Sequence, residues 1–170
     1  MGIFTTESLK SLQDLFKHEL ADLYSAEKQI IEALPEMIQV TSNPKLKQGF
    51  EKHLKETEEQ KNRLEKIAEI TGIELEDVTC KGMKGVIDEG KEIMKMDAEP
   101  EVLDAGLIAA AQRVEHYEIA GYGSAAAHAK ILKLDEAAKL LVQTMDEEKA
   151  TDEKLSKLAE SKVNKEANIN

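Results

Sequence analysis

Carboxylate side chains interrupt otherwise apolar helical faces in this sequence. Apolar residues recur at helical spacing from Leu20 to Leu34, and Glu27 falls in the middle of that face. Further along, Glu148 and Asp152 lie one helical turn apart on a face shared with leucine and methionine residues. Burying a carboxylate is costly unless a partner or a metal ion compensates its charge, and two oxygen ligands one turn apart can bind the same ion. These residues are therefore candidate metal ligands.

Two further segments show the same kind of interruption. Glu56 and Gln60 are again one turn apart, and Glu115 and Glu118 lie on a face that also carries an alanine and a tyrosine. A chain with 34 acidic residues places some of them near an apolar stripe by chance, and most glutamates on helices are solvated. The repetition in four separate segments nevertheless favours a shared interior site.

Four long helices would position these residues. Apolar residues at helical spacing predict the helices, and stretches with glycine and proline separate them. The connection from Gly72 to Pro100 is too long for a bundle hairpin and suits a crossover that lets the second and third long helices lie parallel. The predicted helices span about residues 6–40, 44–71, 100–130 and 135–162, with a short crossover helix at about 82–96.

The predicted helix ends rest on capping residues. Thr6 or Ser8 would cap the first helix, and Asp135 would cap the last. Gly72 would end the second helix in the left-handed conformation. The polar tail from about residue 163 is predicted to fray.

Composition favours a single all-α domain over residues 1–170. Hydrophobic residues make up 41% and charged residues 34% of the chain, while aromatic residues make up 4% and Trp is absent. This composition is typical of helices rather than sheets, and the length suits one hydrophobic core. The helix order and the long crossover together predict a ferritin-like four-helix bundle.

The charge pattern argues against some classes of partner. A formal net charge of −11 at pH 7 would repel nucleic acid and anionic membrane surfaces, and no basic patch offsets it. No stretch is apolar enough to span a bilayer, and the N-terminus has no secretory pattern. The single Cys80 cannot form an intramolecular disulfide. We therefore expect a cytoplasmic protein that binds neither nucleic acid nor membrane.

The segments that carry the candidate ligands have characteristic residues around them. They read DLYSAEKQ at 22–29, HLKETEEQ at 53–60, EHYEIAGYG at 115–123 and DEEKATD at 146–152. Together they resemble the YciF-like bacterial stress proteins of the ferritin-like and rubrerythrin-like superfamily, and the resemblance covers nearly the whole chain. It implies a four-helix bundle that forms a homodimer or a small homo-oligomer and holds a dinuclear metal site.

The resemblance also implies a ligand set for two divalent metal ions. In that superfamily two helices each supply one glutamate, and the other two each supply a glutamate followed by a histidine. The matching positions here are Glu27, Glu56, Gln60, Glu115, Glu118, Glu148 and Asp152.

Two departures from the superfamily pattern shape the expected metal. Gln60 and Asp152 stand where histidines would be expected, so the ligand set is entirely oxygen-based. Oxygen ligands suit hard cations, so we expect iron or manganese, with magnesium or calcium as alternatives. Six carboxylates exceed the charge of two divalent ions, which requires a bound proton or a nearby cation.

Five other polar residues are placed to support this site without joining the ligand set. Arg63 and Arg113, the only arginines, lie within about two turns of candidate ligands and could pair with a carboxylate, or they could be surface residues. Tyr24 and Tyr122 each lie one turn from a candidate glutamate and could donate a hydrogen bond or fill the core. His53 precedes a candidate ligand by three residues and could turn toward the ions.

Three functions are compatible with these residues. The first is stress protection by a dinuclear site that reacts with peroxide or oxygen, or oxidises Fe²⁺. The second is a non-catalytic helical stress protein with a structural or vestigial metal site. The third, an oxygenase acting on an organic substrate, is the least supported because the sequence shows no substrate pocket. Whether the protein is an enzyme stays open at this point.

Overall fold

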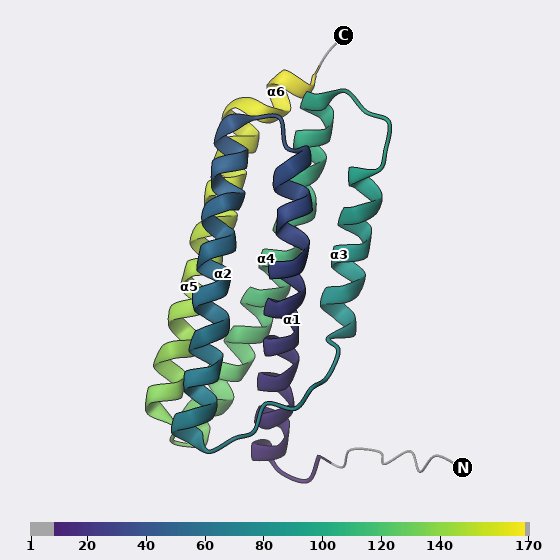
Figure 1. The fold of residues 1–170 in the computed structure, drawn as a ribbon. Helices are drawn as coiled ribbons and strands as arrows, with labels where there is room; N and C mark the ends of the chain where they lie inside the picture. The colour runs from purple at the N-terminus through teal and green to yellow at the C-terminus, as the bar shows by residue number, and fades with distance from the viewer. Residues whose placement is uncertain (1–8, 169–170) are drawn as a thin grey trace, which may run out of the picture.

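The computed structural model describes residues 9–168 as a bundle of helices (Figure 1). No β-strand occurs within that range, which confirms the all-helical prediction. None of the described helices combines the length and the apolar character needed to cross a membrane. The elements are α1 (Leu12–Val40), α2 (Pro44–Thr71), α3 (Lys81–Met94), α4 (Pro100–Ile131) and α5 (Asp135–Leu158), followed by the π-helical turn η1 (Ala159–Val163) and α6 (Asn164–Ala167).

Four of these helices form the bundle, and the fifth lies outside it. α1 packs against α2 and α4, and α5 packs against the same two helices. The connection after α2 runs back along the bundle, so α2 and α4 point in the same direction (Figure 1). α3 lies within that connection and packs against α1 and α4. This arrangement is the predicted bundle with a crossover helix.

The observed helix starts differ from the predicted ones where a different residue provides the cap. The predicted caps Thr6 and Ser8 lie outside the described residues. α1 begins at Leu12 rather than near residue 6, because the Ser11 side chain accepts a hydrogen bond from the Asp14 amide at 3.1 Å. Asp135 was predicted to cap α5, but it is the first helical residue, since the chain turns just before it.

The helix ends also depend on local backbone geometry. Gly72 adopts φ 69° at the end of α2, which confirms the predicted left-handed cap. α3 spans residues 81–94 rather than 82–96, and α5 ends at Leu158 rather than near 162. The tail does not fray as predicted within the described residues: η1 and α6 pack against α4, and Val163 is buried.

The core consists of two apolar clusters with a polar layer between them. One cluster includes Leu34, Phe50 and Leu107, and the other includes Phe16 and Leu141. In α1, α2, α4 and α5 alike, residues of one cluster occupy one half of the helix and residues of the other cluster occupy the other half. Buried polar residues fall between them on each helix: Glu27, His53, Thr57, Gln60, Glu115, Glu118, Thr144 and Glu148. The bundle thus places its polar side chains at one level of its interior.

Two glycines of α3 differ in how closely they approach α4. A Cβ atom at Gly82 would lie 2.6 Å from Cε2 of Tyr117, whereas nothing lies within 4 Å of a Cβ at Gly85. Gly82→Ala is therefore expected to destabilise the protein by about 1–3 kcal/mol, because the Tyr117 ring must move. Gly85→Ala is expected to stabilise it by about 0.5–1 kcal/mol through helix propensity. Urea unfolding of both variants measures the difference, and equal effects would contradict the close packing of α3.

Candidate metal centre

Four buried side chains converge in the polar layer. One donor atom from each of His53, Glu115, Glu118 and Glu148 lies within 4.8 Å of the others. α2 supplies the histidine, α4 supplies two glutamates, and α5 supplies the third. All four residues are buried, with exposed fractions of 4% or less. Within residues 9–168, they form a group of the size and composition that can hold a metal ion.

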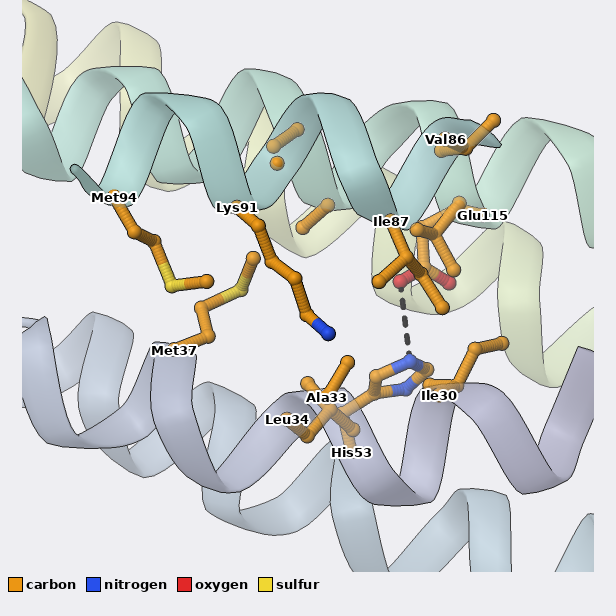
Figure 2. Close-up of a pocket in the computed structure, with 14 residues that line it drawn as sticks. Ile30, Ala33, Leu34, Met37, His53, Val86, Ile87, Lys91, Met94 and Glu115 are labelled. Carbon is orange, nitrogen blue, oxygen red and sulfur yellow. Dashed lines mark ion pairs between the residues drawn. The ribbon is translucent and has the colours of Figure 1, made fainter. Parts of the chain in front are cut away.

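The closest polar contact within this group joins His53 to Glu115. Nε2 of the imidazole lies 3.3 Å from Oε1 of the carboxylate, and Figure 2 shows the two side chains facing each other between their helices. The position of the ring follows from the buried face of α2, which also carries Phe50 and Thr57. The hydroxyl of Thr57 donates to the backbone carbonyl of His53 at 2.9 Å, so it leaves both ring nitrogens to other partners.

Glu27 enters the same layer from α1. Its side chain is fully buried, and the hydroxyl of Tyr122 on α4 donates a hydrogen bond to Oε1. The other oxygen of Glu27 has no hydrogen-bond partner. Tyr122 therefore holds the Glu27 carboxylate from one side, whereas the sequence placed it near Glu118; its role beside a metal stays a prediction.

The pattern of unpaired atoms tests whether these residues fit a metal. Eight buried side-chain nitrogen and oxygen atoms among the described residues have no hydrogen-bond partner, and they belong to these residues only: Glu27, His53, Gln60, Glu115, Glu118 and Glu148. A buried polar atom without a partner typically costs about 1–3 kcal/mol. Concentrating such atoms at one level is costly unless something in the layer binds them. Divalent metal ions fit this donor set, because they bind carboxylate oxygen and neutral imidazole nitrogen.

The electrostatics of the layer favour neutral side chains as long as no cation is bound. Burial raises the pKa of Glu115 and Glu118, and neighbouring carboxylates raise both further. Burial also raises the pKa of Glu27, although the hydrogen bond from Tyr122 opposes this rise. Burial lowers the pKa of His53, which keeps the imidazole in the neutral form that ligates metals. A bound cation would instead favour the charged form of these carboxylates.

A second set of polar residues holds Glu148 from α2. The side-chain amide of Gln60 donates to Oε1 of Glu148 and, at 3.2 Å, to Glu147. The guanidinium of Arg63 donates to both carboxylate oxygens of Glu147 at 2.8 and 3.0 Å, and to the hydroxyl of Thr144 at 2.6 Å. Arg63 is thus linked to Gln60 through Glu147, and its role beside a metal site stays a prediction. One oxygen of Glu148 is left without a partner.

Two predicted ligands lie at the margin of this group. Glu56 is 26% exposed at its side chain and forms an ion pair with Lys52 one turn earlier. Asp152 is 21% exposed and accepts a hydrogen bond from Gln112 at 2.9 Å, with His116 at 3.4 Å. The structure does not bring either carboxylate to the four convergent side chains. Their ligand roles stay predictions.

Two predicted supporting residues point elsewhere, and one lies closer than predicted. The hydroxyl of Tyr24 donates to Glu65 at 2.8 Å, and Arg113 is exposed and donates to the carbonyl of Ala109 on its own helix. His53, expected beside the ligands, is one of the four convergent side chains. The donor set around the candidate centre therefore includes nitrogen as well as oxygen.

Comparison with known proteins agrees with this architecture. Residues 11–168 match the family model described as domain of unknown function DUF892. The chain belongs to this family. YciF of Escherichia coli strain K12 is 47% identical over 161 residues, which cover 94% of this chain and 97% of YciF. The predicted membership of the YciF-like group is thereby confirmed.

Solved structures of similar proteins share the fold. The crystal structure of the E. coli stress protein YciF matches with a TM-score of 0.89 and covers 92% of this chain and 99% of that one. YcfI of Rhodopseudomonas palustris is 40% identical and matches with a TM-score of 0.85, covering 90% of this chain and 98% of its own. The helical arrangement described above is therefore that of YciF.

The raised pKa of Glu118 predicts how the metal-free protein responds to pH. The folded chain favours the protonated form of Glu118, so protonation of this residue stabilises the fold. That stabilisation is complete below the ordinary glutamate pKa of 4.5 and is lost as the pH rises through the raised pKa. Glutamine carries no charge and avoids this loss. Glu118→Gln is therefore expected to be more stable than the parent protein at neutral and alkaline pH. Denaturant unfolding at several pH values, with a chelator present, measures the difference.

His53 also makes the stability of the protein depend on pH. Its lowered pKa adds stability as the pH rises toward the ordinary histidine pKa of 6.5, in the opposite direction to Glu118. The parent protein and Glu118→Gln share this contribution, so it cancels when the two are compared. Glu32→Gln, on the exposed side of α1, is the matched control and should stay within about 0.5 kcal/mol of the parent. A Glu118→Gln protein with the pH dependence of the parent would contradict the raised pKa of Glu118.

Proposed function

We propose that this protein binds two divalent metal ions, iron or manganese, in the polar layer and uses them in protection against oxidative stress. The observation that carries the proposal is the set of eight unpaired donor atoms gathered at one level of the bundle. The description of YciF as a stress protein supports the physiological half of the proposal.

The charges of the layer suit two divalent ions. With Glu56 and Asp152 at the margin, the fully buried carboxylates are Glu27, Glu115, Glu118 and Glu148. Their four negative charges equal the positive charge of two divalent cations. The excess of negative charge that a six-carboxylate set would carry therefore disappears, and no bound proton is required to balance it.

The ligand chemistry also favours iron or manganese over magnesium or calcium. Magnesium and calcium prefer sites made of oxygen alone, whereas imidazole suits iron, and carboxylates suit manganese. His53 adds one neutral nitrogen donor to the carboxylates. Tyr122 and Gln60 each hold one oxygen of a glutamate, which leaves the second oxygen of that glutamate for an ion. Such outer partners orient metal ligands and adjust affinity.

A polar groove borders the layer on one side. A groove of about 540 Å³ between α2 and α5 reaches His53 and Glu115, and Lys52, Glu56 and Lys154 are among its walls. Metal ions and hydrogen peroxide are polar and hydrated, so this groove suits their entry. Each Fe²⁺ would give up one electron, so that two ions reduce dioxygen to hydrogen peroxide, or hydrogen peroxide to water, with two protons consumed.

A second function is favoured by the electrostatics of the same residues. Because burial raises the pKa of Glu27, Glu115 and Glu118, these three side chains can exist as neutral acids without any cation. In that case a bound metal would add stability but no turnover. YcfI of R. palustris is named as a candidate structural protein, which is compatible with this alternative. The proposed redox-active site and this structural alternative differ only in whether the bound metal is turned over.

Metal binding is the first test of the proposal. Protein stripped of metal and titrated with Fe²⁺ without oxygen, or with Mn²⁺, is expected to bind about two ions per chain, as in other two-metal sites. Glu148→Ala and His53→Ala should each lower the affinity by at least about 10- to 100-fold, since even outer partners of metal ligands contribute that much.

The matched control for this titration lies on the same helix as Glu148. Glu153 is exposed on α5 and pairs with Lys157 at 2.6 Å, so Glu153→Ala should leave the stoichiometry unchanged. Absence of binding by the parent protein would refute the metal site altogether.

Redox turnover separates the two functions. Protein loaded with Fe²⁺ without oxygen and then exposed to air or to hydrogen peroxide should develop ferric absorbance faster than Fe²⁺ in buffer. Metal binding and thermal stabilisation without faster oxidation would support the structural alternative.

A further inference from the structure

Two different hollows meet at the pair formed by His53 and Glu115. The polar groove between α2 and α5 reaches the pair from one side. A second pocket of about 40 Å³ lies between α1, α3 and α4, and the same two residues form part of its wall (Figure 2). The candidate metal centre therefore has a polar approach and a separate approach of different character.

The second pocket is lined almost entirely by hydrocarbon. Side chains of α1, α3 and α4 form it, among them Ile30, Leu34, Ile87, Met94 and Val114. Figure 2 shows the α1 and α3 side chains facing each other across the space, with the His53–Glu115 pair at its edge. Beyond that pair, the one charged lining residue is Lys91, whose side chain runs from α3 toward α1.

The hollow exists because small residues occur where the helices approach. Ala33, Gly90, Ala110 and Ala111 all line it. A Cβ atom at Gly90 would lie 3.6 Å from Cβ of Ala110, an ordinary contact, so the absence of a side chain there is not required by crowding. Larger residues at these positions would fill the space against α3.

The size and polarity of the pocket restrict what it can bind. About 10–15 Å³ of such volume holds one water molecule, so about 40 Å³ admits a molecule of a few atoms but no larger organic substrate. Apolar cavities bind small apolar molecules such as xenon, because water inside them finds few hydrogen-bond partners; in this pocket such partners are confined to Lys91 and the His53–Glu115 edge. Dioxygen is a small apolar molecule of this class. Hydrogen peroxide and hydrated cations are not.

We propose that the pocket between α1, α3 and α4 binds dioxygen, or another apolar molecule of its size, and brings it to the His53–Glu115 edge of the polar layer. Polar reactants reach the same edge through the α2–α5 groove. Binding in the pocket depends only on residues of this chain, whereas its chemical consequence rests on the proposed metal site. The two ideas can therefore fail separately.

Xenon binding to the metal-free full-length protein tests the pocket by itself. Crystals pressurised with xenon, or amide chemical shifts followed under xenon, should locate it beside Ile30, Ile87 and Met94. Ala33→Leu should lower the occupancy by about tenfold or more because the side chain fills the space. Ile87→Ala, which enlarges the space, should raise it. Ala127→Leu, on the exposed face of α4, is the matched control and should leave it unchanged.

Oxidation of bound Fe²⁺ by two oxidants then tests the route. Ala33→Leu should slow oxidation by dioxygen several-fold and leave oxidation by hydrogen peroxide at the rate of Ala127→Leu. Equal slowing with both oxidants, or no xenon at the pocket, would overturn the proposal. Xenon binding in a protein that binds no metal would refute the proposed function and leave the pocket intact.

Discussion

The burial of four carboxylates at one level of the bundle is the constraint on which the rest of the structure depends. An isolated buried charge is too costly to persist, so the layer must be neutral acids, or it must hold cations. Glu27, Glu115, Glu118 and Glu148 come from three different helices, and each has at least one oxygen without a hydrogen-bond partner. Without a cation, these groups are held by the packing of the two apolar clusters on either side and by the hydrogen bonds from Tyr122 and Gln60. The clusters therefore supply the stability, and the layer between them is the part whose state can change.

The crossover contributes more than a connection between the two halves of the bundle. The backbone amide of Cys80 donates to Ser25 at 2.9 Å, and its carbonyl accepts from Gln29 at 3.1 Å, so the start of α3 is tied to α1. The thiol of the same residue lies 3.0 Å from the hydroxyl of Tyr117, which ties it to α4. Burial raises the pKa of the Cys80 thiol, which favours the protonated form of the side chain. These contacts fix the outer wall of the apolar pocket.

Much of the fold and part of the candidate site could be predicted from the sequence, because both follow from helical periodicity. The interior positions of Glu27, Glu118 and Glu148 need only the spacing of apolar residues around them. The position of His53 carries the same signal, since Phe50 and Thr57 lie one turn away on either side of it. Glu56, three residues after His53, is partly exposed and does not belong to this buried stripe.

What periodicity could not predict was decided by partners from other helices. Asp152 has the spacing from Glu148 that predicts a ligand, and one of its oxygens accepts a hydrogen bond from Gln112 of α4 at the margin of the layer; its ligand role stays a prediction.

The position of His53 connects the chemistry of the layer with its surroundings. Its ring is the one nitrogen donor in the four-residue group, and it borders both the apolar pocket and the polar groove. Burial lowers the pKa of His53 and so keeps its imidazole neutral. In the proposed site, the four carboxylates would already balance the charge of two divalent ions, and His53 would add a ligand without adding charge. A structural site could be built from carboxylates alone. In the proposed function, His53 would be a neutral ligand at the place where the polar groove and the apolar pocket meet, so both kinds of reactant would arrive at the same ligand.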